Sequence, residues 1–287
     1  MIGGILNLLK PPGMTSHDAV SFIRRTYGLK RVGHAGTLDP AAAGVLPVFL
    51  GQATRLIEYT TDTDKSYRVE LTFGYQTDTG DDTGKIINTS SADMPGQKEI
   101  YMVLDSFVGT IEQIPPMYSA IKIQGKKMYE LARDGITVER KPRTVTIYNI
   151  AVVKFTPKGI LFDVTCSKGT YIRSLCMDIG EKLGCPAVMS FLVRTRVGQF
   201  DLANARTVEE VTINKDSILL PSDRALEHLP AITLSIDEAL AFQHGRSIFY
   251  EEVTLDIARI YDQRGHLIGV GQYSINSSML VPVKVLQ

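Results

Sequence analysis

A glycine- and proline-rich stretch at residues 33–40 most constrains how this chain of 287 residues folds. It reads Gly-His-Ala-Gly-Thr-Leu-Asp-Pro, and residues 41–47 continue it with small residues, another glycine and a second proline. Glycine lets the backbone approach a ligand closely, and proline keeps the residue before it out of the helical region. Asp39 is the only acid of the stretch, and the twelve residues before it contain no other. The stretch therefore suits the presentation of one carboxylate in a fixed direction, although an ordinary Asp-Pro turn has the same composition.

The composition predicts a soluble globular protein with a sizeable core. Hydrophobic residues make up 44% of the chain, and 31 basic side chains balance 31 acidic ones. The length allows one large domain, or a large and a small one. Basic residues outnumber acidic ones within residues 21–55, 122–146 and 166–198, so folding can gather them on one phosphate-binding face. Ordinary solvated surface is the alternative interpretation.

Three further features exclude whole classes of protein. The cysteines at 166, 176 and 185 form no CxxC pair, which argues against a disulfide framework and for a reducing compartment, so we expect the cytoplasm. The histidines lack metal-site spacing, and the acidic loop at 74–84 lacks the spacing and closing glutamate of a calcium loop, so we expect no metal. No apolar run approaches roughly 18 residues, so we expect no membrane span.

Hydrophobic periodicity predicts both strands and helices before residue 200. Residues 65–73 alternate apolar and polar side chains, which predicts a half-buried strand with Tyr67 on its apolar face. Ser16 is a candidate N-cap for a helix that ends at Gly28. In a strand predicted at 188–197, alternation places Arg194 and Arg196 on one face. We also predict strands at 4–9, 143–155 and 160–167, and helices at 52–60, 98–107, 126–133 and 171–183.

The composition changes after Phe200, where the sequence becomes more acidic and more broken. Residues 202–230 predict short helices and connectors. A helix at 235–243 and strands at 253–261 and 266–273 then predict a small β-rich unit, which residues 281–285 end. We therefore place a domain boundary between residues 230 and 231. About 55 residues is marginal for an independent core, so we expect this unit to pack on the main body.

Six short motifs occur in order between residues 4 and 200. They lie at residues 10–17, 33–40, 65–69, 115–120, 167–175 and 191–194. Any one of them is weak evidence, but together they closely resemble the successive motifs of the TruB family, the tRNA pseudouridine(55) synthases. The tail of the chain is more loosely similar to a PUA-type RNA-binding domain.

The resemblance implies a fold, a reaction and a partner. The fold would be α+β, with a mixed, mainly antiparallel sheet flanked by helices in residues 1–230 and a small PUA-like domain in residues 231–287. The reaction would convert uridine to pseudouridine at position 55 in the T-loop of tRNA, by flipping the base out, cleaving the glycosidic bond and rejoining C5 to C1′. The enzyme would act as a monomer on tRNA, without metal or organic cofactor and without a membrane.

The resemblance also assigns catalytic roles to three residues. Asp39 matches the catalytic aspartate, and Arg173 matches the arginine that pairs with it and keeps it ionised. Tyr67 matches the tyrosine that stacks on the flipped base, and its hydroxyl can take part in proton transfer from C5. Without the resemblance, a turn aspartate, a solvated helix arginine and a core tyrosine would be the simpler interpretations.

Four residues match substrate-binding positions of the family. Tyr67 would stack on the base, Tyr171 and Leu192 would line the uracil pocket, and His34 would fill the space that the base vacates. Ordinary core, helix-start and turn residues are the alternative interpretations. Charge alone further suggests phosphate contacts from Lys10, Lys65, Lys126, Lys127 and Arg194.

Two other classes of protein remain open on the sequence. An RNA-binding or tRNA-folding protein without catalysis would be expected to replace Asp39 or Arg173, and both are present. A glycosidase or base-exchanging transferase would want a second carboxylate, and the sequence around Asp39 offers none nearby.

Overall fold

The computed structural model describes residues 3–91, 93–119, 121–123, 125–136, 138–250, 256–274 and 277–286. The chain forms two compact units. The first unit comprises Met1–Pro40, Leu46–Asp62 and Gln199–Gln287, and the second comprises Ala41–Val45 and Thr63–Gly198.

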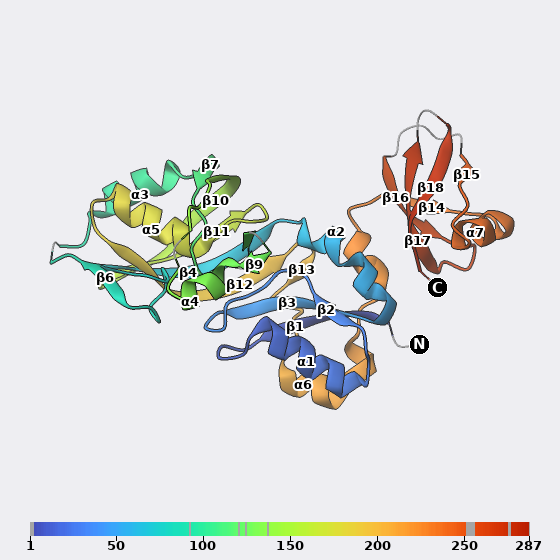
Figure 1. The fold of residues 1–287 in the computed structure, drawn as a ribbon, viewed down its shortest axis with the longest axis horizontal. Coiled ribbons are helices and arrows are strands. Elements are labelled where there is room, and N and C mark those ends of the chain that lie inside the picture. The colour runs from blue at the N-terminus through green and yellow to red at the C-terminus, as the bar shows by residue number, and fades with distance from the viewer. Residues whose placement is uncertain are drawn as a thin grey trace. The chain divides into compact units, whose positions relative to one another are not determined.

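The second unit is built on a mixed, mainly antiparallel sheet, which confirms the predicted fold class (Figure 1). Strand β4 (Lys65–Phe73) pairs antiparallel with β12 (Ala187–Val197) on one side and β11 (Gly159–Cys166) on the other. The sheet continues from β11 to β10 (Arg143–Thr156) and then to β7 (Gly109–Gln113). Strand β3 (Ala43–Leu50), which begins in this unit, pairs in parallel with β12.

Burial along β4 follows the predicted alternation. Tyr67, Val69, Leu71 and Phe73 are buried, and the residues between them are more exposed. Helix α5 (Ile172–Lys182) packs against β4 and β12, and α3 (Gln97–Asp105) packs against α5. The sheet thus buries one apolar face under helices, as the period of two in the sequence indicates.

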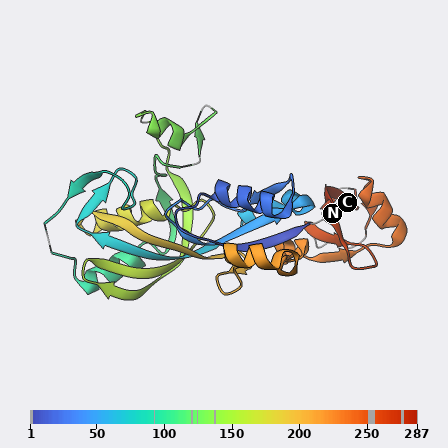
Figure 2. The same cartoon turned by 90° about the horizontal axis from the view of Figure 1, so that it is seen from below.

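Two short hairpins extend from the second unit. Strand β5 (Tyr75–Thr77) pairs with β6 (Ile86–Thr89), and β8 (Lys122–Ile123) pairs with β9 (Lys126–Lys127). Helix α4 (Met128–Arg133) follows β9 directly. In Figure 2 the green segment that carries β8, β9 and α4 projects from the sheet of this unit.

The first unit encloses a core between strands and helices. Its strands are β1 (Gly4–Lys10), β2 (Val32–His34) and the later residues of β3, and its helices include α1 (Ser16–Tyr27) and α6 (Val208–Asn214). Apolar side chains from all five elements form one buried cluster. Before residue 231 this unit also contains β13 (Phe200–Asp201), α2 (Ile57–Thr61) and the 3-10 helices Gly51–Leu56, Lys215–Ile218 and Ser222–Leu226.

Residues after 230 form a separate sheet with its own core. Its strands are β14 (Ala231–Thr233), β15 (Ile248–Phe249), β16 (Ile257–Tyr261), β17 (Leu267–Ser274) and β18 (Met279–Val285). Their order in the sheet is β14-β16-β17-β18-β15, and α7 (Ile236–Gln243) packs on it through Phe242. Residues 253–255 of the strand predicted at 253–261 lie outside the described residues.

Two local predictions are corrected. The helix expected at 52–60 is a 3-10 turn, Gly51–Leu56, followed by the short α2. The N-cap of α1 is Thr15, one residue before the predicted Ser16, and Gly28 ends the helix in the left-handed conformation as expected. Thr15 and Asp18 form a complete capping box, so the helix start is satisfied without Ser16.

Gly44, the glycine of β3, should tolerate substitution poorly. Its φ is +117°, and an added Cβ would lie 2.2 Å from the carbonyl oxygen of Arg194 on the paired strand. We expect Gly44→Ala to lower the free energy of unfolding by roughly 2–4 kcal/mol, measured by urea denaturation. Gly28→Ala is the control, because φ there is +64° with nothing within 4 Å of the added Cβ, so it should cost only about 1–2 kcal/mol. Equal losses would show that the contact with β12 is not what requires glycine.

Candidate functional site

Asp39 lies in a loop whose backbone is hydrogen-bonded on both sides of it. Before it, the Ser16 hydroxyl accepts from the Leu38 N–H at 2.9 Å and donates to the Leu38 carbonyl at 3.1 Å. After it, the Pro40 carbonyl accepts from the Gly13 N–H at 2.8 Å. Pro40 also restricts the backbone of Asp39 itself. The half-buried aspartate is therefore presented from a fixed main chain, as the sequence indicates.

Lys10 adds a third attachment to this loop. Its side chain is fully buried, and its ammonium donates to the carbonyls of Pro11 at 2.8 Å, Met14 at 2.7 Å and Pro40 at 3.4 Å. A buried ammonium needs such partners, because an unpaired charge in the interior is costly. The predicted phosphate contact of Lys10 is therefore wrong, and its role is to join the first motif to the aspartate loop.

The other predicted phosphate contacts have mixed outcomes. Lys65 and Arg194 are also buried, at 7% and 1% exposure, so neither presents its charge to solvent. Periodicity cannot reveal this burial, because the position of a lysine or arginine in the sequence does not say which distant carbonyls its side chain will meet. Lys126 is exposed on β9 and its phosphate contact stays a prediction; the side chain of Lys127 lies outside the described part of the chain.

Arg173, on the first turn of α5, is held in a socket. Its guanidinium donates from Nη1 to the Thr79 carbonyl at 3.0 Å and from Nη2 to the Tyr118 carbonyl at 2.7 Å. Nη1 also lies 3.9 Å from a carboxylate oxygen of Asp81, and the Arg173 side chain is only 7% exposed. The planar fork of an arginine fits two carbonyls in different directions, which the single ammonium of lysine does not.

Asp81 organises the acidic loop that supplies part of this socket. Its Oδ1 accepts from the Thr79 hydroxyl at 2.8 Å, and from the N–H and hydroxyl of Thr83 at 3.1 and 2.6 Å. The sequence indicates a turn-rich loop here that is unsuited to calcium. The structure gives the loop another role, since it fixes both the Thr79 carbonyl and a carboxylate beside Arg173.

Gln113 fixes the backbone at the start of α5. The Tyr171 N–H donates to Gln113 Oε1 at 2.7 Å, and Gln113 Nε2 donates to the Tyr171 carbonyl at 3.1 Å. Gln113 is buried at 2% exposure and ends strand β7. Ser174 adds a bond from its hydroxyl to the Ile114 carbonyl at 2.8 Å. The residue before the helix and its first turn are therefore fixed to the end of β7.

Tyr67 and Arg194 lie opposite each other on β4 and β12. A side-chain hydrogen bond joins them, and Arg194 Nε also donates to the Val45 carbonyl at 2.8 Å. Burial lowers the pKa of Arg194 from its ordinary value, and the bond to Tyr67 partly offsets that effect. The register shifts between Arg194 and Arg196, so the simple alternation that predicts one face for both arginines fails at this bulge.

The two units share the six candidate residues. Tyr67, Tyr171, Arg173 and Leu192 belong to the second unit, and His34 and Asp39 belong to the first. Leu192 is buried on β12, opposite Val69 of β4. A common pocket for all six stays a prediction. The supporting roles of Ser16, Asp81 and Gln113 are not predicted from the sequence, because bonds to distant backbone groups leave no periodic signal.

Other reactive groups are less suited to a site. Burial raises the pKa of the Cys166 thiol to about 11 and that of Cys176 further, so both are protonated thiols near neutral pH. Among the described residues, no three His, Cys, Asp or Glu side chains are grouped to hold a metal ion. Within the same residues, no helix combines the length and apolar character needed to cross a bilayer.

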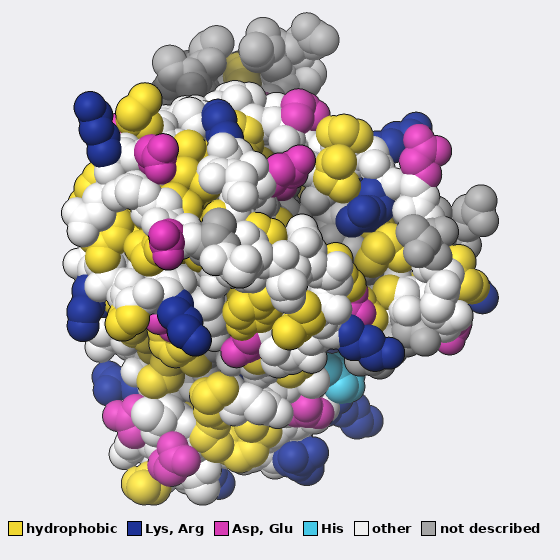
Figure 3. Space-filling view, turned by 90° about the vertical axis from the view of Figure 1, so that its left-hand side faces the viewer, with side chains coloured by type: hydrophobic (Ala, Val, Ile, Leu, Met, Phe, Trp, Pro, Cys, Tyr) yellow, Lys and Arg dark blue, Asp and Glu magenta, His cyan; other side chains and the backbone are white. Residues whose placement is uncertain are grey.

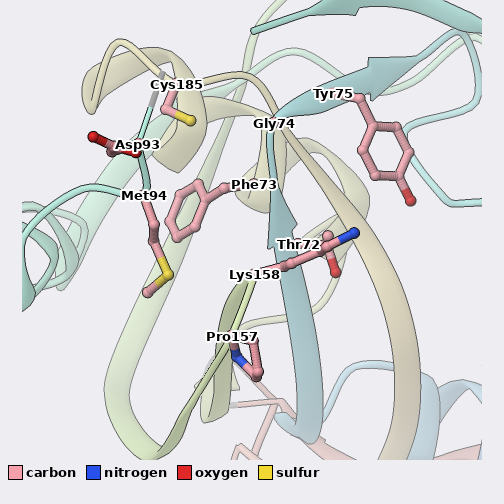
Figure 4. Close-up of a pocket in the computed structure, with 9 residues that line it drawn as sticks. All are labelled: Thr72, Phe73, Gly74, Tyr75, Asp93, Met94, Pro157, Lys158 and Cys185. Atoms are coloured by element: carbon pink, nitrogen blue, oxygen red, sulfur yellow. The ribbon is translucent and has the colours of Figure 1, made fainter. Parts of the chain in front are cut away.

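A cavity of about 400 Å³ lies at the end of β4. Phe73, Met94 and Cys185 contribute apolar surface, and Phe73 points toward Met94 (Figure 4). Asp93 and Lys158 are its charged residues. None of the six candidate residues lines it, so we do not assign the reaction to it.

Charge on the face drawn in Figure 3 is mixed. Lys and Arg side chains there are interspersed with Asp, Glu and apolar ones, in keeping with the zero net charge of the chain. This face is not the uniformly basic surface that the segregation of charge along the sequence allows.

Three family models match successive parts of the chain. A model described as TruB family pseudouridylate synthase (N terminal domain) matches residues 24–172. One described as tRNA pseudouridylate synthase B C-terminal domain matches residues 173–240, and one described as Pseudouridine synthase II TruB, C-terminal, matches residues 230–286.

The matches to individual proteins and to solved structures cover most of the chain. The tRNA pseudouridine synthase B of Alkaliphilus oremlandii is 55% identical over 79% of this chain and 77% of its own. That of Moorella thermoacetica is 42% identical over 100% of both chains. Among solved structures, a chain of a Cbf5-Nop10-Gar1 complex matches with a TM-score of 0.76 at 29% identity, covering 99% of this chain and 84% of that one.

Replacing buried Lys10 should leave the salt dependence of tRNA binding unchanged, because a cation already bonded to carbonyls releases no counterion from RNA. For Lys10→Met we expect the same slope of log K against log salt as the unaltered protein. Exposed Lys126→Met is the comparison, and if Lys126 contacts a phosphate its slope should be less steep by about 0.7–0.9. A shallower slope for Lys10→Met would contradict its structural role.

Arg173→Lys should fold and bind tRNA but turn over slowly. Lysine keeps the charge and loses the planar fork, so we expect turnover at saturating tRNA to fall by about 100-fold or more. Arg68→Lys is the control, because Arg68 on β4 forms an exposed ion pair with Asp163 on β11 at 2.8 Å. Single-turnover assays and binding measurements check both variants. Near-normal turnover of Arg173→Lys would show that the reaction does not need the planar fork.

Proposed function

This chain belongs to the TruB family of pseudouridylate synthases and isomerises uridine in tRNA, and on that premise we propose that its target is uridine 55 in the T-loop. The matches to the family models and to tRNA pseudouridine synthases B support the premise. The uridine of a folded loop must leave its stack before an enzyme can reach it, at a cost of a few kcal/mol. Recognition of the tRNA then rests on the shape of its T-loop and on contacts with the RNA backbone.

We further propose that Asp39 performs the chemistry. The C1′–N1 bond must break and a C1′–C5 bond must form, after which C5 loses a proton and N1 takes one up. An ionised carboxylate can add to the sugar or the base, or balance the positive charge that develops on the sugar. Attack at C1′ or at C6 needs the same charged oxygen. The observation that carries this proposal is the loop of Asp39, tied at Leu38 and Pro40 on either side of the acid.

The other residues support the carboxylate and the base. On the family resemblance we propose that Arg173 pairs with Asp39 and keeps it ionised, with the fork aimed by its socket of carbonyls. Tyr67 stacks on the flipped base and its hydroxyl takes part in removing the C5 proton. Its bond to Arg194 fixes the ring and the hydroxyl. Tyr171 and Leu192 line the uracil pocket, and His34 fills the space that the base leaves.

We propose a division of the chain at residue 230. The separate sheet and core after that position support a C-terminal PUA-like domain at 231–287 that adds RNA affinity, with residues 1–230 as the catalytic domain. The protein would act as a monomer in the cytoplasm without a metal ion.

Asp39→Asn should abolish pseudouridine formation while leaving tRNA binding intact, because asparagine keeps the size of the side chain and loses its charge. The assay is incubation with an unmodified tRNA transcript, followed by mapping of pseudouridine through a chemical adduct. We expect modification at position 55 by the unaltered protein and none by Asp39→Asn. Modification by the variant, or loss of tRNA binding together with activity, would contradict the role assigned to the charge. Modification of a different uridine by the unaltered protein would overturn the T-loop assignment alone.

A further inference from the structure

Ser16 is left without a local role once α1 has been capped. The Thr15 hydroxyl accepts from the Asp18 N–H at 3.0 Å, and the Asp18 carboxylate accepts from the Thr15 N–H at 3.1 Å and its hydroxyl at 2.6 Å. These bonds complete the capping box. Ser16 is nevertheless buried at 3% exposure, which is unusual for a serine on the first turn of a helix.

The hydroxyl of Ser16 is hydrogen-bonded to Leu38, 22 positions further along the sequence. It accepts from the Leu38 N–H at 2.9 Å and donates to the Leu38 carbonyl at 3.1 Å, so it satisfies both backbone groups of that residue. Leu38 is itself buried, at 4% exposure, and water is poorly placed to replace the lost bonds. Leu38 directly precedes Asp39, and Pro40 restricts the backbone on the other side.

We propose that Ser16 is a positioning residue for the carboxylate of Asp39. The proposal rests on the proposed function, in which Asp39 carries the reaction. The hydroxyl acts through the backbone of Leu38, and it sets the direction from which the acid approaches the nucleotide. A displacement of about 1 Å at a reacting group can cost on the order of 100-fold in rate, so a bond to the neighbouring peptide can have a large kinetic effect.

The test compares Ser16→Ala and Ser16→Cys with Ser21→Ala, a serine on the same helix that is only half-buried. Alanine removes both bonds, and cysteine keeps the shape while offering a weak donor and acceptor. At saturating tRNA we expect turnover to fall by about 10- to 100-fold for Ser16→Ala, with a smaller loss for Ser16→Cys and none for Ser21→Ala. The dissociation constant for tRNA should stay within about twofold for all three, since the loss lies in the chemical step.

Several outcomes would overturn the proposal. They are turnover of Ser16→Ala within about twofold of the unaltered protein, a loss confined to tRNA binding, or equal losses for Ser16→Ala and Ser21→Ala. If Ser16→Ala does not fold, Ser16→Cys decides by the same criteria. Asp39→Asn, assayed in parallel, separates this question from the proposed function. An inactive Asp39→Asn beside a normal Ser16→Ala rejects only the positioning role, whereas an active Asp39→Asn rejects the function on which it rests.

Gln113 supports a second, independent inference of the same kind. Its buried side-chain amide accepts from the Tyr171 N–H at 2.7 Å and donates to the Tyr171 carbonyl at 3.1 Å. Tyr171 lies two residues before Arg173. We infer that Gln113 is a positioning residue for Tyr171, which likewise rests on the proposed role of Tyr171 in the uracil pocket. The amide is suited to this because it carries a donor and an acceptor side by side.

A double-mutant cycle tests this inference. Gln113→Met keeps the length of the side chain and removes both bonds, and we expect kcat/KM to fall by about 10- to 100-fold. In a Tyr171→Ala background the same change should cost less than about threefold, since the ring that it positions is gone. Glu112→Gln, at the neighbouring and exposed position of β7, is the control and should have near-normal activity. Full additivity of Gln113→Met and Tyr171→Ala, or normal activity of Gln113→Met, would overturn the inference.

Discussion

The buried ammonium of Lys10 holds the first motif and the aspartate loop together. A charge with no exposure to water is costly unless hydrogen bonds replace its hydration, and Lys10 finds carbonyls in its own turn and at Pro40. The cost of burying the charge is therefore offset only when the first motif and the aspartate loop lie together. All three of these partners are main-chain carbonyls.

Buried arginines in the second unit follow the same rule. Arg173 bonds the carbonyls of Thr79 and Tyr118, and Arg194 bonds the carbonyl of Val45. Each of these bonds joins segments that are distant in the sequence, so the cations fix loops as well as side chains. A guanidinium held in this way has a fixed direction, which favours interaction with a charge or dipole at one defined position.

The sequence predicts much of the fold, but it does not predict most of the contacts that hold the candidate residues in place. The alternation of residues 65–73 predicts β4 and its buried face, because a period of two has one structural meaning. Ser16 shows the limit, since Thr15 caps the helix through a local box with Asp18, whereas the bonds of Ser16 to Leu38 depend on a tertiary contact. Arg194 shows another limit, since a bulge in β12 breaks the alternation that predicts its face. The buried bonds of Lys10 and Gln113 reach backbone groups that no local pattern specifies.

The measurement that tests the central claim most directly is hydrogen exchange at the Leu38 amide in the free protein. If the loop of Asp39 is held before substrate arrives, this amide is protected by its bond to the buried Ser16 hydroxyl and exchanges only through rare opening. The account predicts slow exchange, comparable to that of amides in β4. Exchange at the rate of an unstructured peptide would show that the loop is not fixed in the free enzyme and would contradict the account.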